Sequence, residues 1–406
     1  MAQALDGPRP GPAGTLDRLA AEELGRLRCE GTYRRLRLVE GSQGPRMRVD
    51  GRLVRLFAGS NYLDLAAHPE VVEAASRGAR RWGCAAGGSR LINGNLGCHE
   101  ALEAELAAFL GTESCLVFST GYMANLGVIP ALVGAGDVVV SDALNHASII
   151  DGCRLSQADT RVFPHGDVGV LERILGQVCD GSRRVLVAVD GVYSMDGDLA
   201  PLRELCALTQ RFGALLLLDD AHGTGTLGHQ GRGSAEHLGA PSPDLLLGTL
   251  GKSLGSFGAF VAGSRALREL LVNRARSFIF SCGLAPPQVE AARAALALLR
   301  REPWRRLCLQ RHATRLRQRL AERGISTAPS CTHIVPVVLG DNRRTMAVCQ
   351  GLLEQGFYAQ GIRHPSVPRG TARLRITPMA THSTAEIDAL AEAVAEQLAR
   401  HPSPPG

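Results

Sequence analysis

The residues that could do chemistry follow short apolar runs in the middle of the chain. Asp219 and His222 come directly after one such run, in DDAHGTG, and Lys252 follows another, in GTLGKS. Ser194 follows a third run, in DGVYSMDG, and His146 follows a fourth, in SDALNHAS. Continuous apolar runs of this length are typical of strands that are covered on both faces. Since the carboxyl ends of parallel strands meet at one edge of a sheet, we expect these side chains to face one crevice.

A lysine, an aspartate and two histidines at a common crevice indicate a site for pyridoxal phosphate. The lysine amine attaches the cofactor's aldehyde, and a carboxylate opposite the pyridine nitrogen keeps the ring protonated as an electron sink. An imidazole offers a face for stacking, and amides at a helix N-terminus bind the phosphate. Taken singly, Lys252 has a plainer explanation as a solvated strand end, and Asp219 and His146 as caps. Their joint occurrence favours the cofactor site.

A nucleotide-binding α/β domain is an alternative from another class, because GTLGKS resembles a phosphate-binding loop. That loop requires a glycine five positions before the glycine of the Gly-Lys pair, where this chain has Leu246. A GxGxxG pattern does follow the predicted strand over 213–220, as GTGTLG over residues 223–228, but no helix is predicted to begin there, as a dinucleotide site requires. The nucleotide interpretation is therefore disfavoured, and a cofactor-binding protein without turnover stays open at this point.

Strands and helices alternate around these residues and must position them. We predict strands over residues 115–120, 137–142, 183–191, 213–220 and 244–250, and helices over 99–111 and 201–213. This alternation predicts an α/β fold with a mostly parallel central sheet and helices on both faces. Beyond residue 285 the pattern favours a smaller α+β domain. Its predicted helices cover 285–324, 344–356 and 384–401, and its strands cover 334–340 and 372–378.

The chain divides into five predicted parts. Pro- and Gly-rich composition predicts disordered tails. The parts are a tail over residues 1–15, an N-terminal segment over 16–55, a large cofactor-binding domain over 56–285, a small C-terminal domain over 286–400, and a tail over 401–406.

Composition excludes several classes of protein. The net charge of +6 on 406 residues is spread without a basic stripe, so nucleic-acid binding is not expected. No apolar run approaches the length of a membrane helix, and the opening MAQALDGPRPGPAGT lacks a secretory pattern, so a cytoplasmic enzyme is expected. The eleven cysteines form no CxxC pair. We therefore expect buried free thiols and no metal site.

Long segments of the chain resemble the α-oxoamine synthases, which have the aspartate-aminotransferase-like fold (fold type I of the pyridoxal-phosphate enzymes). The resemblance runs from about residue 30 to 395 and is carried by GGSRLINGNLGCHEALEAELAAFLG, FSTGYMANLGV, DALNHASIIDG, DGVYSMDGDLAPL, LDDAHGTGTLGHQGRGS, GTLGKSLGSFGAF and IRHPSVPRGTARLRIT. It implies a homodimeric, pyridoxal-phosphate-dependent acyltransferase. Such an enzyme joins an amino acid to an acyl thioester of coenzyme A or an acyl-carrier protein, with loss of CO2.

The resemblance also implies individual roles. Lys252 matches the lysine that bears the cofactor, Asp219 the carboxylate on the pyridine nitrogen, and His222 the imidazole near the phenolic oxygen. His146 matches the ring that stacks on the cofactor, and Ser194 a further polar contact. Lys252, His146 and His222 are thus the implied catalytic residues. The implied phosphate contacts are Thr249, Gly121 and Tyr122, and the implied substrate contacts are Arg34 for the acyl group and Arg363 and Arg375 for the amino-acid carboxylate.

Two segments, SMDGDLAPL and IRHPSVPRGTARLR, are most similar to the branch that makes 8-amino-7-oxononanoate in biotin biosynthesis. That branch condenses L-alanine with a pimeloyl thioester. Two residues depart from its pattern: Asp190 stands where glutamate is usual, and Ser60 where asparagine is frequent. A glycine C-acetyltransferase, or an α-oxoamine synthase with another acyl donor, therefore remains the alternative.

Overall fold

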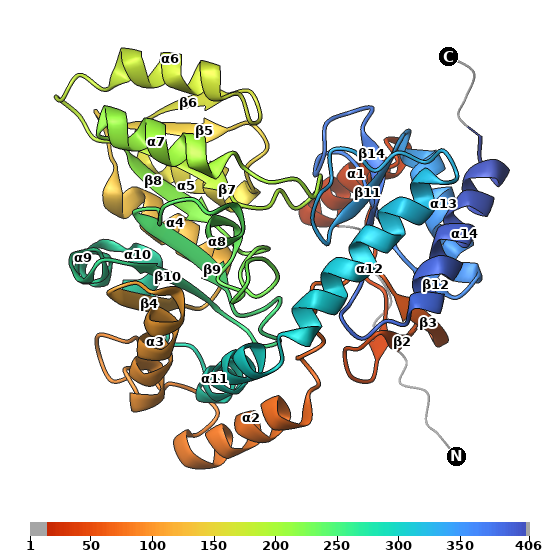
Figure 1. Ribbon diagram of the computed structural model, residues 1–406, viewed down its shortest axis with the longest axis horizontal. Helices are drawn as coiled ribbons and strands as arrows, with labels where there is room; N and C mark the ends of the chain where they lie inside the picture. Colours follow the sequence, from red (N-terminus) through yellow and green to blue (C-terminus); the bar gives the residue numbers. More distant parts are fainter. Residues whose placement is uncertain (1–13, 403–406) are drawn as a thin grey trace.

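A seven-stranded sheet forms the larger part of the computed structural model, which describes residues 14–402 and shows this sheet on the left in Figure 1. Its strands are β4 (Ser114–Phe118), β5 (Val138–Asp142), β6 (Asp159–Phe163), β7 (Val185–Asp190), β8 (Leu215–Asp219), β9 (Leu245–Thr249) and β10 (Ala259–Gly263). They lie in the order β4-β10-β9-β8-β7-β5-β6. Neighbours are parallel except where β10 pairs with β4 and β9. The predicted fold class, with its mostly parallel sheet, is confirmed.

Two strands, β6 and β10, have no counterpart among the predicted runs. Four of the five residues of β6 are exposed, because it is an edge strand that pairs with β5 alone, so it lacks an apolar run. The strand β10 is short and runs against its neighbours. The turn before it contains Gly255 and Gly258, both with positive φ, which reverses the chain over a few residues.

Helices cover both faces of the sheet. On one face α4 (Gly121–Leu132) and α5 (Ala147–Ser156) pack with Leu217, and on the other α6 (Val168–Val178) and α7 (Leu202–Phe212) pack with Leu218. Successive residues of a strand point to opposite faces, so one continuous apolar run serves both layers. The remaining helices of this part are α2 (Pro69–Trp82), α3 (Gly97–Leu110), α8 (Ser234–Leu238), α9 (Arg265–Arg274) and α10 (Arg276–Ile279).

The C-terminal part contains a second sheet and its own core. Strands β11 (Val335–Gly340), β14 (Ala372–Ile376) and β13 (Gln360–Ile362) form an antiparallel sheet against α12 (Trp304–Ala321), α13 (Asn342–Glu354) and α14 (Thr384–Arg400). The helix α11 (Pro286–Arg301) belongs to the predicted C-terminal domain by sequence. However, its Val289 and Leu296 pack in the core that contains Leu102 and Leu106 of α3.

The N-terminal strands join the C-terminal part of the chain. Strands β1 (Val39–Glu40), β2 (Arg46–Val49) and β3 (Arg52–Leu56) form a small sheet with β12 (Phe357–Tyr358). The pairing of β3 with β12 is parallel and brings Arg55 opposite Phe357. The predicted N-terminal segment therefore packs with residues that follow it by about three hundred positions.

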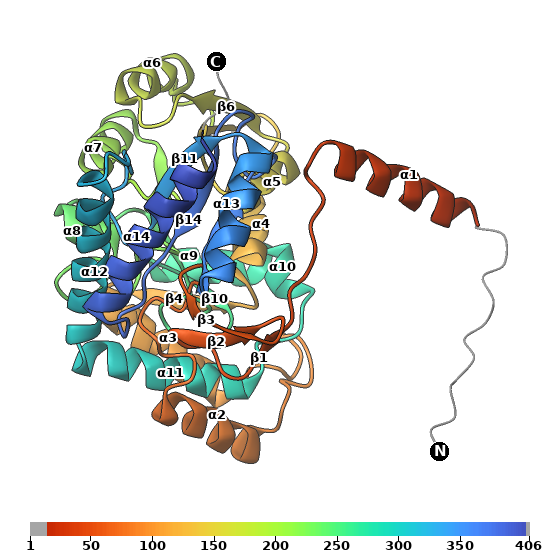
Figure 2. The ribbon, with the colours of Figure 1, turned by 90° about the vertical axis from the view of Figure 1, so that its right-hand side faces the viewer.

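The helix α1 (Thr15–Cys29) projects away from the rest of the chain in Figure 2 and contains no buried residue. Within residues 14–402, Leu16 and Leu19 on this helix are exposed. Most of the predicted tail over 1–15 lies outside the described residues, and Thr15 is the first residue of α1. In the predicted C-terminal tail, residues 403–406 also lie outside them.

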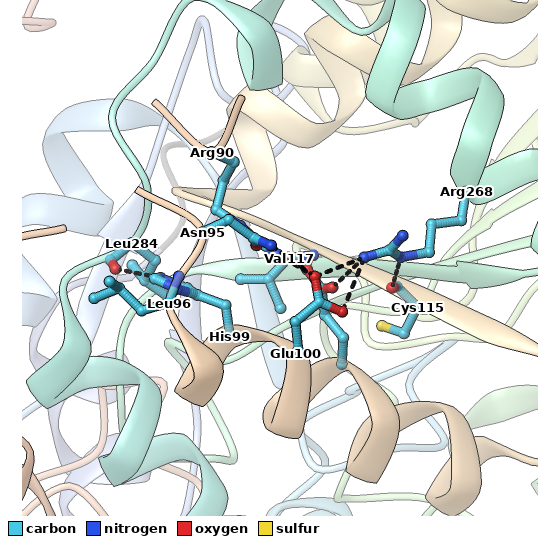
Figure 3. A network of polar contacts seen from close by, with 10 residues as sticks. Arg90, Asn95, Leu96, His99, Glu100, Cys115, Val117, Arg268 and Leu284 are labelled. Atoms are coloured by element: carbon cyan, nitrogen blue, oxygen red, sulfur yellow. Dashed lines mark hydrogen bonds and ion pairs between the residues drawn. The ribbon is translucent and has the colours of Figure 1, made fainter. Parts of the chain in front are cut away.

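A buried polar network anchors the loop before α3 to the sheet (Figure 3). Arg90 donates to Glu103 at 2.8 Å and to Asn95 at 2.6 Å. Glu103 also accepts from the Val117 amide of β4 at 3.0 Å and from Arg268 of α9 at 2.9 Å. The buried Arg90–Glu103 ion pair is thus supported by further hydrogen bonds at both partners, which a buried pair needs to be tolerated.

The cysteines are all free, but they are not all buried. Cys98, Cys115, Cys153 and Cys349 are buried, whereas Cys29, Cys84, Cys282 and Cys331 are exposed. The expectation of free thiols is confirmed, and the expectation that they are buried is wrong for the exposed four. Among the helices in residues 14–402, none has the length and apolar character needed to cross a membrane.

Candidate active site

The predicted site residues gather at the carboxyl edge of the large sheet. Asp190 and Asp219 are the last residues of β7 and β8 and lie directly opposite each other across that strand pair. Both are buried. Burial and the neighbouring charge of Asp219 raise the pKa of Asp190 well above the usual range of a carboxyl group. Because two neighbouring buried carboxylates repel each other when both are ionised, this pair favours one negative charge in total.

The Asp219 carboxylate is held in place by two donors. Asn125 of α4 donates its side-chain amide to Asp219 Oδ2 at 2.7 Å, and the Ala221 amide donates to Oδ1 at 3.1 Å. The same Asn125 amide also donates to Ser148 at 2.9 Å. Because α4 and the turn after β8 both contact Asp219, its carboxylate has a fixed orientation, as a partner for a pyridinium nitrogen requires.

A chain of polar contacts runs from Lys252 to Arg375. Lys252 Nζ lies 2.8 Å from His222 Nε2, and His222 Nδ1 lies 2.7 Å from the Tyr62 hydroxyl. Arg375 of β14 donates to the same hydroxyl at 3.3 Å. If Lys252 donates to Nε2, the proton of a neutral imidazole sits on Nδ1 and is donated to Tyr62. These contacts thus link the amine of Lys252, which follows β9 of the large sheet, to the guanidinium of Arg375 in the C-terminal sheet.

The environment of Lys252 favours its neutral amine. Burial lowers the pKa of Lys252 from 10.5 to about 8, with Asp219 opposing the shift and Arg375 adding to it. Burial, followed by the charges of Lys252 and Arg375, lowers the pKa of His222 well below its usual range. A lysine that is neutral in part at physiological pH can act as a nucleophile or as a base.

His146 is fixed at the N-terminus of α5. Its backbone amide donates to Asp190 Oδ2 at 2.6 Å, and its ring Nδ1 lies 2.8 Å from the Ser148 hydroxyl. Burial lowers the pKa of His146, with Asp219 opposing and Lys252 adding to the shift. A neutral ring in a fixed orientation suits a stacking role. Asp190, which the resemblance marks as a departure, thus holds the backbone that carries this ring.

The N-terminus of α4 offers an anion site. Thr120 caps this helix by accepting from the Met123 amide at 3.1 Å. Among residues 14–402, no group accepts from the amides of Gly121 or Tyr122, and a Cβ on Gly121 would meet open space. Unpaired amides at a helix N-terminus bind phosphate well. The ring of Tyr122 lies edge-on to that of His146, with centroids 6.4 Å apart, so this anion site adjoins the predicted stacking ring.

The Thr249 hydroxyl and the Ser194 backbone carbonyl make contacts within the chain near the same edge of the sheet. The Thr249 hydroxyl donates to the Gly258 carbonyl at 3.0 Å and accepts from the Gly251 amide at 3.2 Å. The Ser194 carbonyl accepts from Arg375 Nε. Both residues therefore shape the loops around Lys252 and Arg375.

Arg34 and Arg363 lie in a separate cavity. Arg34 donates to Ser366 at 3.1 Å, and Arg363 donates to the Tyr33 carbonyl. The cavity measures about 630 Å³, and its lining among the described residues does not include Lys252 or Arg375. The structure thus brings Arg375, but not Arg34 or Arg363, into the contact chain of Lys252.

Three residues of the site were not predicted from the sequence. Asn125 lies inside a helix, and Tyr62 lies in a loop that is far in sequence from the strands before Asp219 and Lys252. His333 precedes β11 and packs edge-on against the Tyr62 ring, with centroids 4.2 Å apart. The rule that ligands bind at the carboxyl ends of parallel strands predicts only residues that directly follow those strands, so it cannot predict these three. One signal was available for the central residue: Lys252 is the only lysine in the sequence.

These groups fit pyridoxal phosphate. The chain's one lysine is partly buried near a fixed carboxylate, and a helix N-terminus with unpaired amides adjoins the imidazole of His146. Lys252 would hold the aldehyde carbon, Asp219 the pyridine nitrogen, and the amides of Gly121 and Tyr122 the phosphate. In residues 14–402, His, Cys, Asp and Glu side chains form no group of three that could hold a metal ion.

Comparison with known proteins agrees with this geometry. The sequence pattern of the family "Aminotransferase class I and II" matches residues 54–394. An 8-amino-7-oxononanoate synthase from Geobacter sulfurreducens is 52% identical over 383 residues, which cover 94% of this chain and 98% of that protein. The one from Methylococcus capsulatus is 47% identical over 380 residues, covering 93% and 98%.

Solved structures match over nearly the same length. Serine palmitoyltransferase from S. paucimobilis, with a bound PLP–myriocin adduct, aligns with a TM-score of 0.89 and 34% identity, covering 95% of this chain and 98% of that one. The 8-amino-7-oxononanoate synthase of Francisella tularensis aligns with a TM-score of 0.74 and 26% identity, covering 86% and 98%.

The residues at the sheet edge, the single lysine among them and these matches lead to the same conclusion. The resemblance to the α-oxoamine synthases is confirmed by relatives that are about half identical over most of the chain. The chain belongs to the class I and II aminotransferase family, in the branch that includes the 8-amino-7-oxononanoate synthases.

Proposed function

We propose that this chain is a pyridoxal-phosphate-dependent acyltransferase that condenses L-alanine with a pimeloyl thioester. The products are 8-amino-7-oxononanoate, CO2 and the free thiol of coenzyme A or an acyl-carrier protein, as in biotin biosynthesis. The observation that carries the proposal is the partly buried Lys252, which contacts His222 at 2.8 Å near the anchored Asp219, in a chain 52% identical to such a synthase.

Each residue of the contact chain receives a role from its geometry. When bound, pyridoxal phosphate supplies an electron sink that acidifies the Cα–H bond of an attached amino acid. Lys252 would hold the cofactor and, once displaced by alanine, accept the Cα proton at its neutral amine. A pKa of about 8 keeps a useful fraction of that amine unprotonated near neutral pH.

The carboxylate of alanine requires a cation near Lys252. Arg375 is buried, contacts the Tyr62 hydroxyl at 3.3 Å and is held at Nε by the Ser194 carbonyl. We assign alanine carboxylate binding to Arg375, since guanidinium groups bind carboxylates by paired hydrogen bonds. We assign proton delivery after loss of CO2 to His222, which contacts Lys252, or to His146, whose pKa the charge of Lys252 helps to lower.

The cavity around Arg34 and Arg363 suits the anionic acyl donor. Its lining includes Arg34, Arg35, Arg37 and Arg363 together with apolar Met346 and Leu353. A pimeloyl chain ends in a carboxylate or its ester, and both carriers are polyanionic. We therefore propose that Arg34 contacts the acyl donor. Arg363, which the resemblance pairs with Arg375, lines the same cavity as Arg34, and we propose that it contacts the acyl donor too.

A thiol-release assay over a matrix of amino acids and acyl thioesters tests the proposal. Each buried methylene contributes about 0.8 kcal/mol, so a pocket shaped for pimeloyl should prefer it to acetyl by about two orders of magnitude or more. We expect alanine with a pimeloyl thioester to give the highest kcat/KM. If glycine with acetyl-coenzyme A were best, the chain would instead be an acetyltransferase.

We further propose that the enzyme is a homodimer. Apolar side chains that are largely exposed within one chain support this: Ile92 is 83% exposed, Phe280 is 71% exposed, and Leu16 of α1 is 76% exposed. Ile92 and Phe280 belong to segments joined by the bridge between Ser89 and Cys282. An apolar surface of this kind is typical of an interface. Free cysteines, which are usual in reducing compartments, support a cytoplasmic location.

A further inference from the structure

The loop between β7 and α7 connects the two parts of the molecule. It folds back on itself through a bridge between Val192 and Leu199, and the Gly197 amide donates to the Tyr193 carbonyl at 2.8 Å. The tip of this hairpin lies against the C-terminal sheet so closely that a Cβ on Gly197 would lie 2.0 Å from the Ile334 carbonyl oxygen. Gly197 has a φ of 73°, so no other residue suits this position.

The tip of the hairpin contacts the arginines of β14. The Ser194 carbonyl accepts from Arg375 Nε, and Asp196 forms an ion pair with Arg373. Thr332 donates to the Gly197 carbonyl at 2.8 Å. These contacts orient Arg373 and Arg375, two buried arginines that lie two residues apart on β14. The direction in which Arg375 points thus depends on where the hairpin tip lies.

The base of the hairpin is held by His165. Its Nε2 lies 2.7 Å from Asp198, and its Nδ1 lies 3.1 Å from Asp142, the last residue of β5. Only an imidazolium can donate at both nitrogens. The hydrogen bonds to Asp142 and Asp198 raise the pKa of His165 to about 10, so the ring is charged in the folded chain. The Tyr193 ring packs edge-on against it, with centroids 4.2 Å apart.

We infer that His165 is a positioning residue for the amino-acid site: clamped between Asp142 and Asp198, it fixes the 192–199 hairpin, whose tip orients Arg375. The inference rests on the proposed role of Arg375 in binding the alanine carboxylate. His165 does not enter the contact chain of Lys252 and acts through the hairpin alone.

The test uses His165→Gln in the full-length enzyme loaded with pyridoxal phosphate. Loss of a charge-assisted hydrogen bond at the hairpin base should raise the KM for alanine about tenfold. The Kd for alanine, read from the change in the cofactor's absorbance spectrum, should rise in parallel. The KM for the pimeloyl thioester should stay within about twofold, since its proposed contacts lie in another cavity.

Two further variants keep the test decisive. Asp198→Asn removes the negative charge from the same contact on the hairpin side, so it should raise the KM for alanine in the same direction as His165→Gln, and the two effects should not add in the double variant. Arg184→Gln is the matched control, because the Arg184–Asp137 ion pair lies at the opposite end of β5 and β7. It should leave both KM values unchanged.

The outcomes separate the inference from the function on which it rests. An unchanged KM for alanine in both His165→Gln and Asp198→Asn overturns the inference, as does an equal rise in Arg184→Gln. If Arg375→Gln also left alanine binding unchanged, the proposed role of Arg375 would fail. If Arg375→Gln weakened alanine binding and His165→Gln did not, only the positioning role of His165 would fail.

Discussion

The charge state of Lys252 is set by neighbours that come from separate parts of the chain. Asp219 stabilises the ammonium form, whereas burial and Arg375 destabilise it, and the result is a pKa of about 8. The neutral His222 ring accepts a hydrogen bond without adding a charge. A single residue therefore combines the two properties that the proposed reaction needs, a covalent anchor and a base.

We predict that Lys252→Ala abolishes turnover while the fold is retained. Since Lys252 is the only lysine in the sequence, the variant has no ε-amine to hold the cofactor. Borohydride treatment followed by mass spectrometry should find reduced cofactor on the wild-type peptide that contains Lys252 and none on the variant. Turnover at the wild-type rate in the variant would contradict the assignment.

Asp219→Asn tests the carboxylate without changing the shape of the site. The amide has one acceptor oxygen, so it keeps the hydrogen bond from either Asn125 or Ala221, and it could not stabilise a protonated pyridine nitrogen. We expect kcat to fall by a factor of about a hundred or more, in line with losses of preorganised electrostatic stabilisation. The absorbance spectrum checks that cofactor stays bound. A variant with bound cofactor and nearly unchanged kcat would make Asp219 a structural residue only.

At the scale of elements, strand ends could be predicted from the sequence and long-range contacts could not. The apolar runs before Asp190, Asp219 and Thr249 are the strands β7, β8 and β9, because a buried parallel strand needs apolar side chains on both faces. Tyr62 and His333 come from segments with no such pattern. Their place beside Lys252 depends on tertiary packing between the N-terminal loop and the C-terminal sheet.

The His165 clamp makes a prediction about pH and stability. His165 titrates near 6.5 when unperturbed and near 10 in the folded chain, where Asp142, Asp198 and Tyr193 face it. Its stabilising contribution is therefore fully present below pH 6.5 and is lost as the pH rises towards 10.

We expect the unfolding free energies of wild type and His165→Gln, both without cofactor, to differ most below that window and to converge across it. Denaturant unfolding at several pH values measures the difference. The lowered pKa of Lys252 acts in the opposite direction above pH 8, but it is common to both chains and cancels in the comparison. A difference that stays constant with pH would show that the ring is neutral in the folded chain.

At the scale of the molecule, assembly is the property most open to a direct test. Ile92, Phe280 and the leucines of α1 are exposed in one chain, and a two-fold dimer is the commonest way to cover such a surface. We expect light scattering to give twice the mass of one chain in active samples. Replacing Phe280 and Ile92 by serine should shift the mass towards the monomer. A fully active wild-type sample that stays monomeric would refute the dimer.

The pairing of β3 with β12 has a consequence for the order in which the chain is made. Arg55 opposes Phe357, so the N-terminal strands cannot complete their sheet until almost the whole polypeptide has left the ribosome. Until then the edge of β3 has unpaired amides and carbonyls, which can pair with another chain. Because domains generally fold as units during synthesis, the sheet around β4–β10 should form before the N-terminal strands find their partner. Truncation before residue 357 would leave the nascent chain with an open strand edge and a higher tendency to aggregate.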